Sequence, residues 1–272
     1  MLQLSLHLLN ILPLETEAHG EGGYQSPGVE SFQFDGNWGI DWLTKPAMQA
    51  IIAALLVIAF WLWGSRQLSV KPTKGQFFFE YVYEFIRNGV ARDTLGHDFR
   101  KFLPYLLAVF SFILVNNWFG EFFLFMLPTF SNIGYAYAVA LLSWIMYMGA
   151  GFAKHGVGGY LKHSLIPPGA PGYLLPLLIP LEFLSNFIVR PVTLALRLFA
   201  NMFAGHLVVL VFVVGGAYLL THGPAIHRVA GGVSLLFSFA ILFLELFVGA
   251  LQAYIFTVLT AQYVSSSIAD EH

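Results

Sequence analysis

Five long runs of apolar residues alternate with short polar segments along the chain. They occupy residues 48–63, 102–127, 135–153, 173–220 and 229–264. A helix that crosses a bilayer needs about 20 mostly apolar residues. The first run is short, but it ends in Trp61 and Trp63, and tryptophan is typical of the membrane interface. The pattern predicts an all-α integral membrane protein with about five membrane-embedded helices.

The last two runs are too long to be upright spans. As continuous helices they would be about 70 Å and about 50 Å long, whereas the hydrocarbon core is about 30 Å thick. Pro176, Pro180 and Pro191 interrupt the fourth run early, which does not shorten it enough. A short turn at 221–228 joins the two runs. We therefore expect a long, strongly tilted antiparallel hairpin over about 173–267.

A further helix is predicted over about 74–94, because apolar and polar residues there alternate at helical spacing. The apolar face consists of Phe78, Tyr81, Val82, Phe85, Ile86 and Val90. Such a helix lies in the plane of the membrane interface, and anchoring or packing is favoured over chemistry. Residues 1–46, which are acidic and rich in glycine, are expected to form an arm outside the membrane. Residues 47–272 are expected to form a single membrane domain.

Positive charges indicate the orientation. Seven of the 13 lysines and arginines lie between the first and second runs: Arg66, Lys71, Lys74, Arg87, Arg92, Arg100 and Lys101. Cytoplasmic loops carry an excess of Lys and Arg, so this loop should be cytoplasmic. Alternation along the five runs then places the N-terminus outside and the C-terminus in the cytoplasm, with Arg228 as the one cation on the wrong side.

Composition supports a membrane protein and excludes several chemistries. Hydrophobic residues make up 57% of the chain and charged residues 10%, against about 25% charged residues in soluble domains. The net charge of −2 argues against nucleic acid as a partner. Without cysteine there is no disulfide and no thiolate metal site. No P-loop motif is present, and we expect no cofactor and no metal.

Arg197 is the anomaly of the sequence, because it lies in the middle of the fourth run. Arginine cannot lose its proton, and a charge at the bilayer centre costs at least about 2.5 kcal/mol. Snorkelling to water works only near helix ends. A functional role is therefore favoured over a passive buried ion pair. Asn201, four residues on, shares the arginine's face, whereas His206 lies nine residues on and about 180° around the helix.

The fifth run carries a matching polar stripe. Glu245, Gln252 and Tyr263 are spaced by seven and eleven residues, which places them on one helical face. If Gln252 is level with Arg197, antiparallel pairing places Glu245 about 10 Å further outward, near His206. The sequence thus offers a fixed cation with an amide at mid-depth and a titratable pair nearer the outside.

Other polar residues lie on both sides of the arginine. Asn116, Asn117 and Glu121 fall in the outer half of the second run, and Glu182 falls on the inner side of Arg197. Interhelical hydrogen bonding is the alternative for the two asparagines, and a headgroup-level surface carboxylate is the alternative for Glu182. The arrangement predicts two water-accessible half-pathways with a fixed positive charge between them. It needs a moving carrier with its own carboxyl group.

Two segments resemble the subunit a family of F-type ATP synthases. They are RPVTLALRLFANMFAGHL at 190–207 and LELFVGALQAYIFTVLTAQYV at 244–264. The resemblance implies a stationary, non-catalytic proton-channel subunit in the plasma membrane of a bacterium. The implied partners are the rotating c-ring, the subunit b stalk, membrane lipid and, indirectly, a soluble catalytic head.

The resemblance also implies roles for single residues. Arg197 matches the essential arginine that faces the c-ring, with Gln252 and Asn201 as polar companions. His206 and Glu245 match the pair that lines the outer half-channel. Glu182 resembles a carboxylate of the inner half-channel.

Two other functions fit parts of the pattern. A secondary transporter could bind an anion at Arg197, but such folds usually contain internal repeats, and none is found here. A haem-bearing respiratory subunit needs axial histidines within its spans, and only His206 lies deep in one. Co-purification with a ring distinguishes the channel subunit from a transporter, which should work alone. An absorption spectrum tests for haem. Protons are favoured over sodium because of His206 and because no hard-cation cage is evident.

Overall fold

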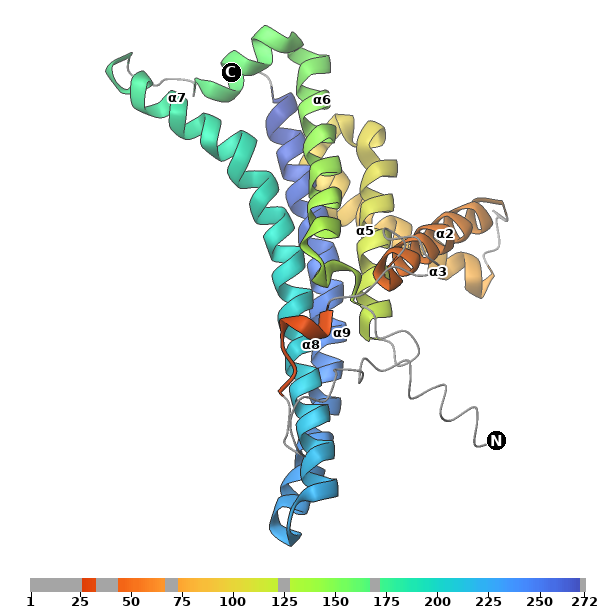
Figure 1. Ribbon diagram of the computed structural model, residues 1–272. Helices are drawn as coiled ribbons and strands as arrows, with labels where there is room; N and C mark the ends of the chain where they lie inside the picture. Colours follow the sequence, from red (N-terminus) through yellow and green to blue (C-terminus); the bar gives the residue numbers. More distant parts are fainter. Residues whose placement is uncertain (1–25, 33–43, 67–72, 122–127, 167–171, 270–272) are drawn as a thin grey trace. The chain divides into compact units, whose positions relative to one another are not determined.

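The computed structural model describes residues 26–32, 44–66, 73–121, 128–166 and 172–269. All regular elements in these ranges are helical (Figure 1). The main helices are α2 (Lys45–Arg66), α3 (Lys74–Ile86), α5 (Phe99–Glu121), α6 (Ile133–Leu165), α7 (Leu175–Phe183), α8 (Arg190–His222) and α9 (Ala225–Ile268). Short elements connect them: η1 (Val29–Phe32), π-helical η2 (Arg87–Arg92), α4 (Asp93–Leu95), η3 (Gly96–Asp98), η4 (Thr129–Ser131), η5 (Gly172–Leu174) and π-helical η6 (Leu184–Val189).

Five helical segments are long and apolar enough to cross a bilayer. This confirms the all-α membrane fold. The first is longer than predicted, because α2 has 22 residues where the apolar run has only 16 positions between 48 and 63. The second ends at Glu121 in the described part of the chain, and the predicted end of that run at 122–127 lies outside the described residues. The predicted arm over 1–46 is likewise almost wholly outside them.

The prolines of the fourth run do not break its helix. Pro180 lies inside α7, and the π-helical turn η6 leads directly into α8, whose second residue is Pro191. Proline lacks an N–H and its ring crowds the carbonyl four residues earlier. A π-helical turn shifts the hydrogen bonds to the fifth residue, which accommodates Pro191 without ending the helix. The apolar segment is therefore helical from Gly172 to His222.

The third run bends where the sequence pattern predicted its end. Gly156 has φ 70° and ψ 168° inside α6, a conformation that glycine adopts readily and other residues avoid. After this bend the chain folds back on the helix. The ring of Tyr160 lies against Gly151, where any Cβ would collide with it, and the rings of His155 and His163 stack with centroids 5.4 Å apart.

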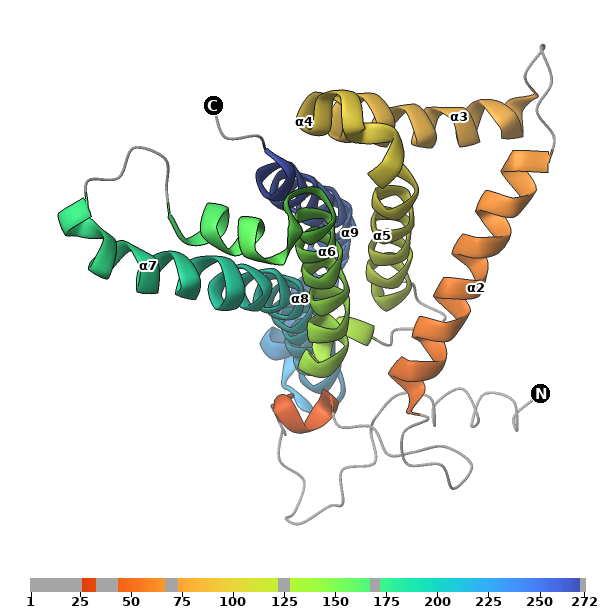
Figure 2. The same ribbon diagram turned by 90° about the horizontal axis from the view of Figure 1, so that it is seen from above.

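Helix α3 is the predicted amphipathic helix. Thr73 caps it by accepting a hydrogen bond from the Gln76 N–H, and Figure 2 shows it running across the ends of α2 and α5. Phe79 is buried against Trp61, with ring centroids 4.9 Å apart. The remaining aromatic residues of the helix are largely exposed, as expected for a helix at a lipid interface. Its position in the interface plane stays a prediction.

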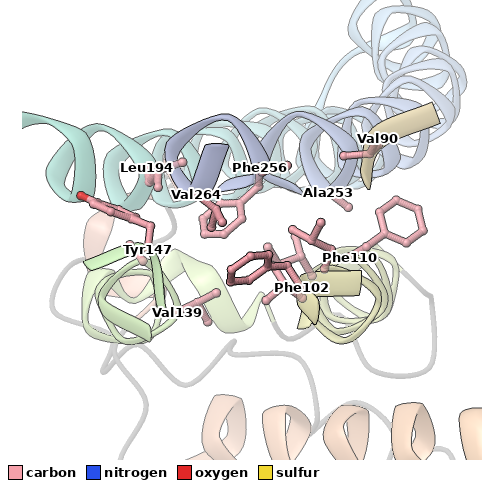
Figure 3. Packing of buried hydrophobic residues seen from close by; sticks show 14 of the residues in the cluster. Val90, Phe102, Phe110, Val139, Tyr147, Leu194, Ala253, Phe256 and Val264 are labelled. Atoms are coloured by element: carbon pink, nitrogen blue, oxygen red, sulfur yellow. The ribbon is translucent and has the colours of Figure 1, made fainter. Parts of the chain in front are cut away.

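The chain forms two compact units. The first comprises Met1–Phe34 and His206–Leu242, and the second comprises Asp35–Gly205 and Phe243–His272. The hydrophobic core lies in the second unit, where apolar side chains of four helices meet (Figure 3). Fully or almost fully buried members are Leu106 and Ile113 of α5, Ala140 and Tyr147 of α6, Leu194 and Leu198 of α8, and Phe256 and Val264 of α9.

In the first unit, the parts of α8 and α9 next to the turn that joins them form an antiparallel hairpin, which confirms the predicted pairing there. The Arg228 Nε donates to the Gly223 carbonyl across the turn, at 3.1 Å. Further along, a Cβ on Gly231 would lie 2.7 Å from the Gly216 carbonyl oxygen. Two glycines therefore allow the backbones to touch, a common device in membrane helix pairs. The tilt of the hairpin stays a prediction.

Candidate functional site

Arg197 lies on the exposed face of α8. Leu194, Ala195 and Leu198 are buried in the core, while Arg197 and Ala200 are exposed on the opposite face. Arg197 forms no hydrogen bond and no ion pair with any residue that the structure describes, which excludes an ion pair within that part of the chain. A permanent charge on a small-residue helix face is thus available to a group from outside the chain.

The register of α8 against α9 supports the predicted level of Gln252. The Glu245 carboxylate lies directly against the backbone of Gly205, where any Cβ would collide with it. Eight residues before Gly205 is Arg197. In an antiparallel pair the corresponding position on α9 is eight residues after Glu245, at Ala253, beside Gln252.

The amide companions of the arginine differ in burial. Asn201, one turn further along α8, is half-buried. Gln252 is buried, and its Nε2 forms no hydrogen bond with a described residue. A buried amide donor without a partner is uncommon and calls for a specific explanation. Water or an acceptor from another chain would satisfy it.

Helix α5 packs on the turn of α9 that carries Glu245. Asn117 Nδ2 donates to the Gly249 carbonyl at 2.9 Å, and Trp118 Nε1 donates to the Leu246 carbonyl at 3.1 Å. Glu121 is only 5% exposed and is close enough to Glu245 for the two carboxylates to interact electrostatically. The structure therefore brings together two of the predicted outer carboxylates, from helices more than 100 residues apart in sequence. We call Glu121, Glu245 and Asn117 the outer cluster.

The two asparagines of α5 use their amide groups in packing. Asn117 bonds to the α9 backbone, as above, and Asn116 Nδ2 donates to the Phe112 carbonyl of its own helix at 2.8 Å. Both residues are buried, and neither Oδ1 bonds a described residue. The interhelical hydrogen-bonding alternative thus accounts for the Asn117 nitrogen, whereas the Asn116 nitrogen bonds within its own helix.

His206 follows Gly205 on α8 and is only 4% exposed. The sequence analysis expected His206 to lie near Glu245, and His206 is the residue directly after Gly205, which contacts Glu245. The pairing of His206 with Glu245 stays a prediction.

A polar pocket of about 200 Å³ lies on the other side of Arg197 along the chain. It is lined by Tyr160, His163, Ser164, Glu182, Asn186, Arg190, Ser266 and Ser267, and we call it the inner pocket. Asn186 lies about 15 Å before Arg197, and Gly205 lies about 12 Å after it, by helical rise. The arginine thus separates the inner pocket from the outer cluster.

Asn186 organises the inner pocket. Its Nδ2 donates to the Ser164 backbone carbonyl at 2.8 Å and to Glu182 Oε2 at 3.2 Å. The backbone carbonyl of Asn186 accepts a hydrogen bond from the Tyr147 hydroxyl at 3.0 Å. Glu182 is half-buried and is held in this network rather than standing alone at the surface. This favours a pocket carboxylate over the headgroup alternative.

Arg190 of α8 lines the pocket and contacts Tyr263 of α9. The Arg190 guanidinium lies over the Tyr263 ring, 4.9 Å from its centroid, a favourable cation–π geometry. Tyr263 also packs against Tyr147, with centroids 5.7 Å apart. Tyr263 therefore contacts a residue that lines the inner pocket, whereas Glu245 of the same α9 stripe belongs to the outer cluster.

Sequence reasoning missed several pocket residues. Tyr160, His163 and Ser164 follow the bend at Gly156, and the apolar pattern treats that region as a loop. Arg190 precedes Arg197 by seven residues, two helical turns, and this spacing is a signal that could have identified it.

Comparison with known proteins identifies the family of this chain. Residues 47–265 match the family model described as ATP synthase A chain. A protein named ATP synthase subunit a from a Nocardioides species is 47% identical over 245 residues, covering 90% of this chain and 89% of the relative. The protein of that name from Pseudarthrobacter chlorophenolicus is 37% identical over 267 residues, covering 96% and 100%. The one from Frankia alni is 41% identical over 255 residues, covering 91% and 87%.

The family match covers most of the chain, including α7 with Glu182, α8 with Arg197, and α9 as far as residue 265, with Glu245 and Gln252. The relatives are similar over nearly their full lengths, so the likeness is not restricted to one motif. The chain, with its five apolar helical segments and Arg197 exposed on α8, belongs to the ATP synthase A chain family.

Proposed function

We propose that this chain is the stationary proton-channel subunit of an F-type ATP synthase, with two offset half-channels that Arg197 separates. Membership of the family supports a role in proton transport and ATP synthesis. One observation carries the finer proposal. Arg197 is exposed and without a partner among the described residues, between an inner polar pocket and an outer carboxylate cluster.

The outer cluster is the entry path. A proton from outside reaches Glu245 with the help of Glu121 and His206, and passes to a carboxylate on the rotating c-ring. Gly205 matters because it lets the Glu245 carboxylate lie against α8. Once neutral, the ring carboxyl can face lipid, which an ionised carboxylate cannot do cheaply.

The inner pocket is the exit path. A ring carboxyl that arrives there loses its proton to water held by Glu182 and Asn186, and the proton leaves on the cytoplasmic side. A pocket of about 200 Å³ has room for several waters, since each occupies roughly 30 Å³ in the liquid. Driven by ATP hydrolysis, the same steps run in reverse.

Arg197 keeps the two paths apart. Its charge attracts an ionised ring carboxylate and repels a proton that would cross directly between the paths. Because arginine does not deprotonate, the barrier persists at every working pH. The partner that compensates the charge is the ring carboxylate itself, which agrees with the lack of an ion pair among the described residues.

The remaining assignments follow from this role. The chain does not catalyse ATP synthesis, which belongs to the soluble head of the complex, and subunit b joins the two parts. The N-terminus lies outside a bacterial plasma membrane and the C-terminus in the cytoplasm, as the positive charges indicate.

Reconstitution tests the proposal. Proton flux is measured in vesicles that contain the chain alone, the chain with the c-ring and subunit b, or the full complex. We expect ATP-driven flux from the full complex, passive conduction from the chain with its ring and subunit b, and no flux from the chain alone. A chain that transports protons or a small anion by itself would instead be a secondary transporter.

A further inference from the structure

A second cavity lies where the interfacial helix meets α5, away from the site described above. Its volume is about 420 Å³, and its lining includes Tyr83, Arg87, Phe99 and Arg100. The buried side chains of Leu103 and Leu107, together with Pro104, complete the lining. The proton path does not use any of these residues. The cavity thus combines two cationic side chains with an apolar floor.

The two arginines gather around one aromatic ring. The Cζ atoms of Arg87 and Arg100 each lie 5.9 Å from the Phe99 ring centroid, so they are at most twice that distance apart. Neither side chain makes a hydrogen bond or an ion pair with a described residue. Two guanidinium groups carry ten N–H donors between them, and they are available to one ligand.

Nearby carboxylates do not neutralise this pair. Glu80 Oε1 accepts a hydrogen bond from Gln76 Nε2 at 2.7 Å, and Glu84 and Asp98 are exposed. None of the three forms an ion pair with Arg87 or Arg100. The inner pocket differs, because it contains Glu182, which would repel an anion. The second cavity therefore selects for a negatively charged ligand.

The apolar surface beside the cavity indicates that the ligand has an apolar part as well as a negative charge. Along α5, Pro104 and Ala108 are exposed on the same face as Arg100, at spacings of four residues that align them on the helix. This face runs about 12 Å from the arginine toward the middle of α5. On α3, Phe78 and Tyr81 are exposed, as is typical of residues at the headgroup level.

We propose that this cavity binds the headgroup of an acidic phospholipid. Arg87 and Arg100 hold the phosphodiester through charge-assisted hydrogen bonds, a geometry that arginine matches well. The Tyr83 hydroxyl lies in the same cavity, and one acyl chain follows the Pro104–Ala108 face. Basic pockets beside membrane helices commonly recognise such headgroups. The apolar floor and track favour a lipid over free phosphate.

Native mass spectrometry of the full chain in neutral detergent tests this site, by titration with phosphatidylglycerol and with phosphatidylcholine. The double variant Arg87→Gln/Arg100→Gln should bind phosphatidylglycerol about ten-fold more weakly than the wild-type chain. The matched control is Arg66→Gln/Arg92→Gln, which removes the same charge from exposed arginines of the same segment and should change binding less than about two-fold. Arg100→Gln alone alters only an exposed side chain and should give an intermediate loss, even if the double variant does not fold.

Several results would overturn the proposal. Equal losses in the two double variants would show diffuse surface attraction, and equal binding of both lipids would show no site for an acidic headgroup. Displacement of the lipid by millimolar inorganic phosphate would show a soluble-anion site. In the assembled complex, a photo-reactive residue in place of Ala108 should attach to lipid. Attachment to a protein band would show that another subunit fills the cavity.

Discussion

Arg197 and Gly205 constrain α8 in different ways, one through its charge and the other through its lack of a side chain. Arg197 needs a compensating negative charge, and it forms no ion pair with any of the described residues. Gly205 requires the absence of a side chain, because the Glu245 carboxylate occupies that space. Both requirements concern charge placement inside a membrane, where errors are costly.

The contact at Gly205 predicts a specific defect. Gly205→Ala places a methyl group where the Glu245 carboxylate lies, so the carboxylate must move away from α8. We expect ATP-driven proton pumping in inverted vesicles to fall at least about ten-fold, the effect of about 1.4 kcal/mol on a barrier. Gly232→Ala is the matched control, because a Cβ there meets nothing within 4 Å. Equal pumping by the two variants would show that the Gly205 contact is irrelevant.

His206 and Glu245 should act as a pair. His206→Glu places two carboxylates together, and like charges disfavour joint ionisation. Glu245→His removes the carboxylate altogether. The exchanged double variant restores one group of each kind and should recover more pumping than either single variant. A double-mutant cycle measures the coupling, and strictly additive losses would mean that the two residues work independently.

At the scale of elements, the pattern of apolar residues predicted which helices exist better than it predicted where each helix begins and ends. The run at 48–63 became α2, with 22 residues, since helices continue past the last apolar residue when their ends can be solvated or packed. The run at 135–153 became the part of α6 that precedes the kink at Gly156. The bend at Gly156 left no trace in the periodicity, because a positive φ changes the direction of the chain and not its composition. The inner-pocket residues after this bend were therefore missed.

The antiparallel register of α8 and α9 was predictable, because it follows from placing one polar residue of α8, Arg197, level with one of α9, Gln252. Placing Gln252 level with Arg197 put Glu245 near the end of the motif that contains Gly205, and the structure has Glu245 against that glycine. Which side chains contact each other within this register was less predictable from the sequence. The Tyr263 ring packs against the Arg190 guanidinium, a contact that the sequence analysis did not predict.

The two faces of α8 predict which side meets the ring. Ala200 is exposed and Ala195 is fully buried, and both are alanines within two turns of Arg197. Ala200→Cys should form a disulfide with a cysteine placed near the ring carboxylate, and this bond should stop rotation. Ala195→Cys, the control, should not react. Cross-linking yields are compared on non-reducing gels after mild oxidation, and a higher yield at Ala195 would reverse the assigned face.

At the scale of the molecule, the account requires one orientation in the membrane. The loop between the first two spans holds seven of the 13 lysines and arginines, and the predicted topology places Arg228 on the other side of the membrane. A thiol reagent that cannot cross membranes should label Lys74→Cys only from the cytoplasmic side and Arg228→Cys only from outside. Labelling is measured in intact cells and in inverted vesicles. The reverse pattern would exchange the entry and exit paths.

ATP synthesis by an assembled Arg197→Ala complex tests the central claim most directly. The complex is reconstituted in vesicles and driven by an imposed proton gradient, with Arg228→Ala as the exposed-arginine control. The account predicts synthesis at background level for Arg197→Ala, and also for Arg197→Lys because lysine can lose its proton in an apolar site, with near-normal synthesis for the control. Normal synthesis by an assembled Arg197→Ala complex would contradict the account.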